Sequence, residues 1–267
     1  MTAAFRHARK YVLIARVSLS DAMAYRARIL SRFCFYTLFI YVFMRLWGSI
    51  YEVDAIPGFT RVQMVWYLIM TELVQFVGNT GIFGAMNDEV KSGAIAYQIG
   101  RPIHYVFYQL ANAAGKMLLN LVGFGALALV LGLVFVGPLT TFKLIYLPPL
   151  LLSLVISFLL NFFFQMALGL TAFVIEENSS VYMVYQKITF ILGMFFPIEF
   201  LPVWLQNIAK NLPFSYICWA PAKLFVSFSA ETFWYLVPRQ LLWLAVSLAA
   251  VLLAYRACVK RLQLNGG

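Results

Sequence analysis

Six apolar runs, each long enough to cross a lipid bilayer as a helix, constrain this chain of 267 residues more than any other feature. A transmembrane helix needs about 20 mostly apolar residues, because it must satisfy its backbone hydrogen bonds internally within the bilayer. Hydrophobic residues make up 63% of the sequence and charged residues only 11%, well below the share typical of soluble domains. The sequence therefore predicts an all-α integral membrane protein. Its six transmembrane helices are expected at about residues 33–50, 62–84, 108–136, 144–175, 181–196 and 233–257.

Basic residues gather at the two ends of the chain. Seven Lys and Arg precede the first apolar run, and Arg256, Lys260 and Arg261 follow the last. Because Lys and Arg concentrate on the cytoplasmic side of membrane proteins, we expect a multi-pass protein with both termini cytoplasmic, in a bacterial plasma (inner) membrane. Contact with anionic membrane lipids then accounts for the net charge of +10, and no nucleic-acid partner is expected.

Three segments outside the apolar runs complete the expected single transmembrane domain, residues 1–267. Residues 1–32 alternate apolar and basic positions, which predicts a cytoplasmic helix lying in the membrane interface. Residues 86–105 are too polar to span the membrane and are expected to be cytoplasmic. Residues 197–230 are expected outside, as a re-entrant helical hairpin between spans five and six. Pro197 and Pro202 interrupt the helix there, because proline lacks an N–H and clashes with the preceding turn.

Motifs for nucleotide hydrolysis and for common enzyme chemistry are missing. The sequence contains no G-x-x-x-x-G-K-[ST] loop, so nothing in it is expected to cradle a nucleotide phosphate. It also contains no H-E-x-x-H and no G-x-S-x-G. The three cysteines, Cys34, Cys218 and Cys258, lack metal-ligand spacing. We therefore expect no catalytic residues, no metal and no cofactor in this chain.

Polar side chains inside the predicted spans form three groups. The first follows one face of span two, the second recurs every fourth residue in span three, and the third is a pair in span four. Their members are Glu72, Gln75 and Asn79; Asn112, Lys116 and Asn120; and Asn161 and Gln165. Two interpretations stay open. These faces line a path for a polar or charged solute, or they hold helices together, with Glu72 paired to Arg45 or Lys116.

Two stretches carry a resemblance to a known family. "FFPIEFLPVWLQNIAKNLPFSYICWAPAKLF", residues 195–225, resembles the signature of type-2 ABC exporter permeases, in which a span ends in Phe-Pro before an amphipathic helix. "NDEVKSGAIAYQIGRPIHY", residues 87–105, is similar to the cytoplasmic connection of the same permeases. Within this family the chain is most similar to the branch in which two related permeases often accompany a separate ATPase.

The resemblance implies an ATP-driven exporter of a lipid-like or amphipathic solute. It implies a second permease, related or identical, and separate ABC-type ATPase subunits that bind the ATP and Mg²⁺. Residues 87–105 would couple to the ATPase through Asp88, Glu89, Lys91, Gly93 and Arg101. The hairpin would form an outer gate, bordered by Phe195, Phe196, Pro197, Glu199, Pro202 and Trp204. Glu72 and Glu199, with the many aromatic residues, would allow a cationic solute.

Two other functions remain open. The chain could be a secondary transporter that uses Glu72 as a proton site, although no inverted repeat is visible in the sequence. It could instead be a membrane scaffold that recruits an ATPase and has no transport path of its own.

Overall fold

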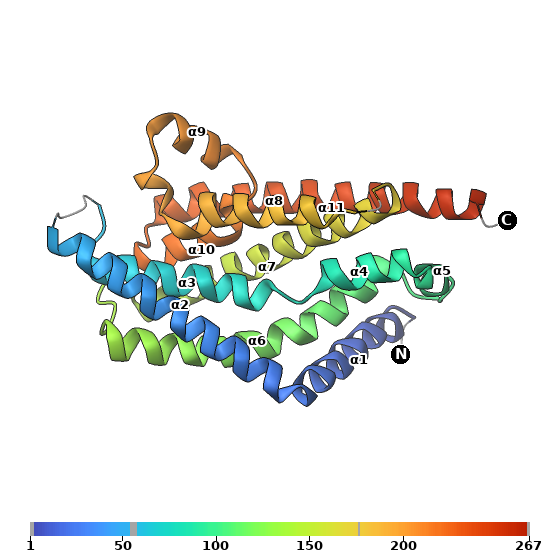
Figure 1. The fold of residues 1–267 in the computed structure, drawn as a ribbon, viewed down its shortest axis with the longest axis horizontal. Helices are drawn as coiled ribbons and strands as arrows, with labels where there is room; N and C mark the ends of the chain where they lie inside the picture. Colours follow the sequence, from blue (N-terminus) through green and yellow to red (C-terminus); the bar gives the residue numbers. More distant parts are fainter. Residues whose placement is uncertain (1–2, 54–57, 176, 266–267) are drawn as a thin grey trace.

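The computed structural model describes residues 3–53, 58–175 and 177–265, and every regular element in these ranges is a helix. Four long helical stretches are apolar enough to cross a membrane: Arg26–Glu52, Tyr105–Phe135, Leu144–Phe173 and Ala230–Lys260. They belong to α2 (Arg26–Val53), α6 (Tyr105–Phe135), α7 (Leu147–Leu170) with its short flanking helices, and α11 (Ala230–Asn265). They extend roughly along the long axis of the molecule (Figure 1). An all-helical membrane protein is thus confirmed, and the count of six spans stays a prediction.

Helix α3 (Arg61–Gly78) occupies the position of predicted span two and lies in the middle of the bundle. Thr60 and Gln63 form a capping box at its start, which satisfies two otherwise free backbone donors. Thirteen of its 18 residues are buried, as expected of a helix that is apolar on most of its surface. The apolar run was expected to continue as helix to residue 84, but α3 ends six residues earlier. A new helix, α4 (Ile82–Lys91), begins after Gly81, whose φ of 77° suits glycine.

Predicted span five is α8 (Ser179–Thr189) followed by a π-helical turn, η3 (Phe190–Phe195). π-helical turns free backbone carbonyls for other partners. Here the Tyr67 hydroxyl of α3 donates to the Gly193 carbonyl at 3.1 Å, and the Thr71 hydroxyl lies 3.4 Å from the Met194 carbonyl. Side chains of the central helix therefore replace the hydrogen bonds that the widened turn loses.

The chain between α8 and α11 folds as a helical hairpin. After a short turn, η4 (Ile198–Phe200), it forms α9 (Val203–Asn211) and α10 (Ser215–Val226). Pro197 and Pro202 directly precede η4 and α9, as proline geometry predicts. Helix α9 projects from the bundle, whereas α10 is buried against α3 and α7 (Figure 1). The hairpin shape is present, and its insertion into the membrane stays a prediction.

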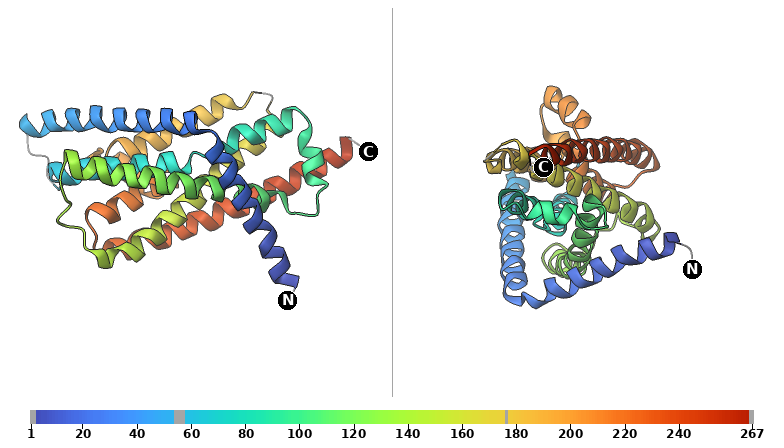
Figure 2. Two further views of the ribbon diagram at one scale, coloured as in Figure 1. Left: turned by 90° about the horizontal axis from the view of Figure 1, so that it is seen from below. Right: turned by 90° about the vertical axis from the view of Figure 1, so that its right-hand side faces the viewer.

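The N-terminal helix α1 (Ala3–Ala24) crosses the bundle at a steep angle to α2 (Figure 2). The bend lies at Tyr25, so the expected surface helix of residues 1–32 is shorter, and the first span starts at Arg26 rather than at 33. Helix α1 packs against α6, where the Ser18 hydroxyl donates to the Asn112 carbonyl at 2.7 Å. Gly115 permits this contact, because a Cβ there would collide with the α1 backbone at Ala15.

Candidate functional site

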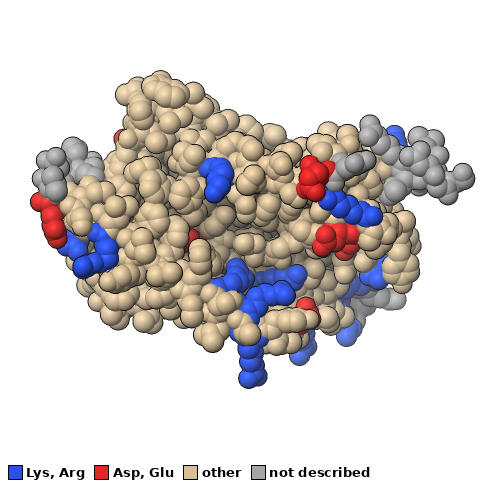
Figure 3. Space-filling model, viewed as in Figure 1, with Lys and Arg blue, Asp and Glu red and all other residues tan. Residues whose placement is uncertain are grey.

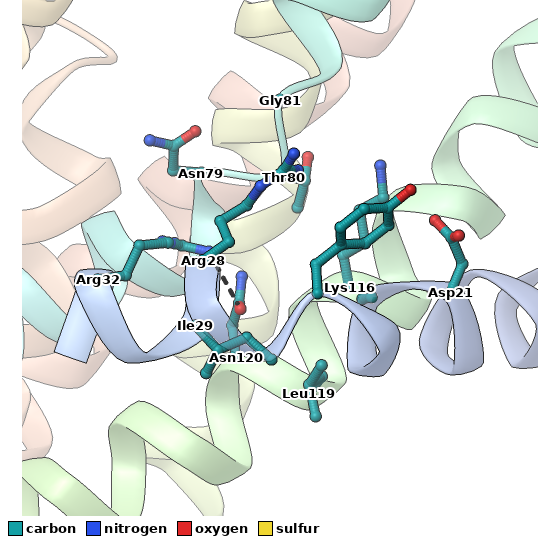
Figure 4. Close-up of a pocket in the computed structure, with 12 residues that line it drawn as sticks. Asp21, Arg28, Ile29, Arg32, Asn79, Thr80, Gly81, Lys116, Leu119 and Asn120 are labelled. Atoms are coloured by element: carbon teal, nitrogen blue, oxygen red, sulfur yellow. Dashed lines mark hydrogen bonds between the residues drawn. The ribbon is translucent and has the colours of Figure 1, made fainter.

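A cavity of about 290 Å³ lies where the α1–α2 bend, the α3–α4 break and α6 meet (Figure 4). It brings together Asn79, Lys116 and Asn120, three residues of the predicted solute path, from the end of α3 and from α6. The remaining lining residues are Asp21, Ala22, Tyr25, Arg28, Ile29, Arg32, Thr80, Gly81 and Leu119. Sequence reasoning placed the two arginines on a surface helix and missed them as site residues. Their spacing of four residues at the start of an apolar run was the signal available.

Arg32 is held in the cavity wall by the end of α3. Its guanidinium donates to the Phe76 carbonyl at 2.5 Å and to Asn120 Oδ1 at 3.3 Å. The last carbonyls of a helix lack intrahelical partners and carry partial negative charge, so an arginine and an amide donor are suitable partners. Asn120 Nδ2 also lies 3.4 Å from the Phe76 and Val77 carbonyls. Arg32 can therefore lie within the first candidate span, because protein groups solvate its charge.

In the part of the chain that the structure describes, the Arg28 and Lys116 side chains have no hydrogen bond, unlike Arg32, and none of the three cations forms an ion pair. The Arg28 guanidinium lies 5.0 Å from the Tyr25 ring centroid. Asp21 is the one carboxylate that lines the cavity, against three cationic side chains. Lys and Arg side chains gather around the α1–α2 bend in the space-filling view (Figure 3). The arrangement attracts anions and disfavours cations.

Glu72 lies outside this cavity, in the buried interior of α3, with an exposed fraction of only 2%. In the part of the chain that the structure describes it forms no ion pair with Arg45 or Lys116, and its Oε1 atom has no hydrogen-bond partner. Gln75 is half-buried on the same helix. A buried carboxyl oxygen without a partner is uncommon, which keeps Glu72 as a candidate functional group.

The other predicted path residues hold helices together. The Tyr185 hydroxyl and Gln165 Nε2 both donate to Asn161 Oδ1 at 2.8 Å, and Gln165 Nε2 also donates to the Gly78 carbonyl at 3.2 Å. These bonds join α7 to α3 and α8. The backbone carbonyl of Asn112 receives the bond from Ser18 of α1. Their geometry agrees with interhelical bonding, and their contact with a solute stays a prediction.

The predicted outer gate is packed against the C-terminal half of α2. The rings of Phe195 and Phe196 contact Phe43 and Trp47, with centroid separations of 5.3 and 5.8 Å. Behind them the Glu199 carboxylate is paired within the hairpin: Lys223 Nζ lies 2.8 Å from Oε1.

Trp219 completes the Glu199 site, since its Nε1 donates to Oε2 at 3.3 Å. Trp204 on α9 is 64% exposed. The charge of Glu199 is therefore already balanced by the protein.

The predicted coupling residues separate into an anchored and an exposed set. Glu89 of α4 accepts a hydrogen bond from the Tyr105 hydroxyl at 2.6 Å and lies 3.3 Å from Gln109 Nε2. Both partners belong to α6, so Glu89 fixes the segment instead of projecting from it. Asp88, Lys91, Gly93 and Arg101 are exposed.

The exposed set surrounds α5 (Ala94–Ile99), which begins after Gly93, a residue with a φ of 74°. Arg101 stacks over Tyr97, whose exposed fraction is 72%, at 4.9 Å. Lys91 lies 3.5 Å from Glu177. Hydrogen bonding from Ser179, with a smaller effect of Lys91, lowers the pKa of the Glu177 carboxyl. This surface offers charged and aromatic groups to a protein partner.

Comparison with known proteins identifies the family. A search of curated proteins found no match to this chain. The family model described as "ABC-2 family transporter protein" matches residues 33–266, which is most of the sequence and includes the coupling segment and the hairpin, whereas the cavity-lining residues of α2 precede the match. The resemblance seen in the sequence is thereby confirmed. The chain belongs to the ABC-2 family of membrane transport components, and this membership implies association with ABC-type ATPase subunits.

Proposed function

We propose that the chain is the permease subunit of an ATP-driven exporter of amphipathic, lipid-like solutes. It would pair with a second permease and with separate ATPase subunits that bind ATP and Mg²⁺, in a bacterial plasma membrane with both termini cytoplasmic. One observation supports this function above the others. The segment formed by α4 and α5 exposes Asp88, Lys91 and Arg101 to a partner while Glu89 ties it to α6.

The hydrogen bonds of Glu89 could transmit a movement of α4 and α5 to α6. A partner that displaces α4 and α5 acts directly on α6, because Glu89 binds both Tyr105 and Gln109 at the start of that helix. It also acts on α3 through the short Asn79–Gly81 connection. Rigid helices with fixed contacts transmit such displacements without internal rearrangement. ATP hydrolysis in the partner would in this way reorient the helices that line the cavity.

The two ends of the permease support export. The inner cavity is open at the level of the α1–α2 bend, whereas the outer hairpin is closed by aromatic packing and by the Glu199–Lys223 pair. A transporter that loads from the inner side would rest in such a state. Because Glu199 is neutralised, a cationic solute receives little support, and Glu72 is the only predicted cation site left with an unpartnered oxygen among the described residues.

The experiment is co-expression with the genetic neighbours, purification in mild detergent, and identification of the co-eluting proteins. An ATP-binding protein together with one further permease, and ATPase activity in the complex, is the expected result. Glu89→Gln should retain assembly but reduce the coupling of ATPase activity to transport, with Glu231→Gln, an exposed carboxylate outside both the segment and the cavity, as a charge-matched control. A chain that elutes without any ATPase would contradict the proposal.

The buried carboxyl of Glu72 favours one second candidate, a proton-coupled transporter. In proteoliposomes without ATPase, such a transporter would move solute in response to a pH gradient, and Glu72→Gln would abolish the movement. Thiol labelling of cysteines placed at positions 72, 75 and 79 distinguishes both transporters from a scaffold, which would have no water-accessible path.

A further inference from the structure

The inner cavity has the composition of a site for an anionic group. Arg28, Arg32 and Lys116 line it from two helices, and Asp21 is the one opposing carboxylate. Arg32 is engaged by Phe76 and Asn120, but the charges of Arg28 and Lys116 are not matched by any ion pair in the described ranges. Cationic side chains held close together without counter-charges are expected to recruit an anion.

Two polar features of the α3–α4 break add to these charges. The N-terminus of α4 borders the cavity at Gly81, and no side chain caps it. Free N–H groups at such a terminus favour negatively charged oxygen atoms. Thr80, also in the lining, is 9% exposed, and its Oγ1 atom has no hydrogen-bond partner in the described chain. A buried hydroxyl without a partner is expected to bind something that the protein does not supply.

Position and volume indicate what the anion belongs to. The cavity lies at Tyr25, where the amphipathic α1 turns into the first candidate span, and such a turn is expected at the level of lipid headgroups. Its volume of about 290 Å³ is at the lower limit for drug-sized ligands, so it suits a headgroup better than a whole lipid. Further along the same two helices, α2 and α6, an open apolar hollow of about 460 Å³ is lined by residues that include Phe33, Leu38 and Phe135.

We propose that this cavity binds the phosphate headgroup of an anionic lipid. Arg28 and Lys116 provide the charge, Thr80 and the start of α4 donate hydrogen bonds to the phosphate oxygens, and the acyl chains lie on the exposed apolar surface of α2. The proposal does not depend on the energy source of transport. The lipid-binding experiment uses the permease alone, so a result that contradicts the export function would leave this proposal standing.

The experiment measures lipid binding to the purified chain in detergent by native mass spectrometry. The probe is phosphatidic acid, and diacylglycerol with the same acyl chains is the control that lacks phosphate. The variant Arg28→Gln/Lys116→Gln should lose at least about tenfold in affinity, since hydrogen bonds to charged groups are the stronger ones. Arg32 is left in place, because its bonds to Phe76 and Asn120 support the fold.

The matched control is Arg16→Gln/Arg256→Gln, which removes two exposed charges that do not line the cavity. It should retain affinity within about twofold, because isolated surface charges contribute little. Thr80→Val keeps every charge and the side-chain shape, and should still weaken binding by about threefold to tenfold. This single variant keeps the test valid if the double variant fails to fold.

Three results would overturn the proposal. Equal losses in the two double variants would show general attraction by charge instead of a site. Equal binding of diacylglycerol would exclude the phosphate. Displacement of the lipid by glycerol phosphate or inorganic phosphate at matching concentrations would assign the cavity to a water-soluble phosphate compound.

Discussion

The cavity at the α1–α2 bend and the hairpin of α9 and α10 both contain charged groups, but these groups are paired with one another only in the hairpin. In the hairpin, Glu199 is paired with Lys223 at 2.8 Å and receives a further bond from Trp219. In the cavity, Arg28 and Lys116 face one carboxylate and lack ion pairs in the described chain. Charges in the hairpin bind each other and stabilise the fold, while charges in the cavity are available to a ligand. Pairing, more than the mere presence of charge, therefore separates structural from binding groups here.

The largest expected effect concerns Arg32. Like the charged pair of the hairpin, and unlike the other cavity cations, its side chain is bound by protein groups in the described chain. Arg32→Met leaves the Phe76 carbonyl with only the 3.4 Å contact from Asn120 Nδ2, and should lower the free energy of unfolding by about 2–3 kcal/mol. Arg28→Met, which loses only a contact with Tyr25, should change it by less than about 0.5 kcal/mol. Denaturation in mixed micelles measures both. Equal effects of the two changes would remove the distinction between engaged and free arginines.

The next effect tests the pairing in the hairpin. Lys223→Met leaves the carboxylate of Glu199 without its ion-pair partner. This change should lower the free energy of unfolding by about 1–2 kcal/mol, because both side chains are only partly exposed. Adding Glu199→Gln should restore most of this loss, since the uncompensated charge is then removed. The same denaturation assay applies. Failure of the second substitution to restore stability would mean that Lys223 acts mainly through its cation–π contact with Phe59.

A smaller effect on stability, with a clear effect on transport, is expected at the Glu89 tie. Glu89→Gln keeps one acceptor for the Tyr105 hydroxyl but loses its charge, and should cost about 1 kcal/mol of folding stability. ATP turnover per transported solute should rise in the reconstituted complex. If the variant complex couples ATP turnover to transport as efficiently as the complex with the unchanged chain, Glu89 has only a structural role.

The smallest effect is expected for the exposed Lys91–Glu177 pair. Lys91→Gln should leave the unfolding midpoint unchanged, because water and salt screen exposed charges. Any loss should instead appear in binding of the ATPase subunit, measured by co-purification. An altered midpoint would place this pair with the structural ones.

The sequence was sufficient for features that depend on local patterns. Apolar runs located the long helices, and Pro197 and Pro202 located the breaks of the hairpin. The features that it missed depend on partners far along the chain. Arg32 is accommodated within the first candidate span because it reaches a carbonyl 44 residues away, and Glu199 is neutralised by a lysine on another helix. The end of α3 was missed because the apolar run continues past Asn79, although the glycines on both sides were a usable signal.

The contact between α1 and α6 has a mechanical consequence. At Gly115 the two helices meet backbone to backbone, so no flexible side chain is present to absorb a relative displacement. A tilt of α1 is therefore expected to tilt α6, whereas the break at Tyr25 would let α2 keep its position. If α1 lies in the membrane surface as predicted, the membrane and the proposed ATPase would both act on α6, the first through Gly115 and the second through Glu89. Surface tension and lipid packing would then influence the motion that we propose ATP drives.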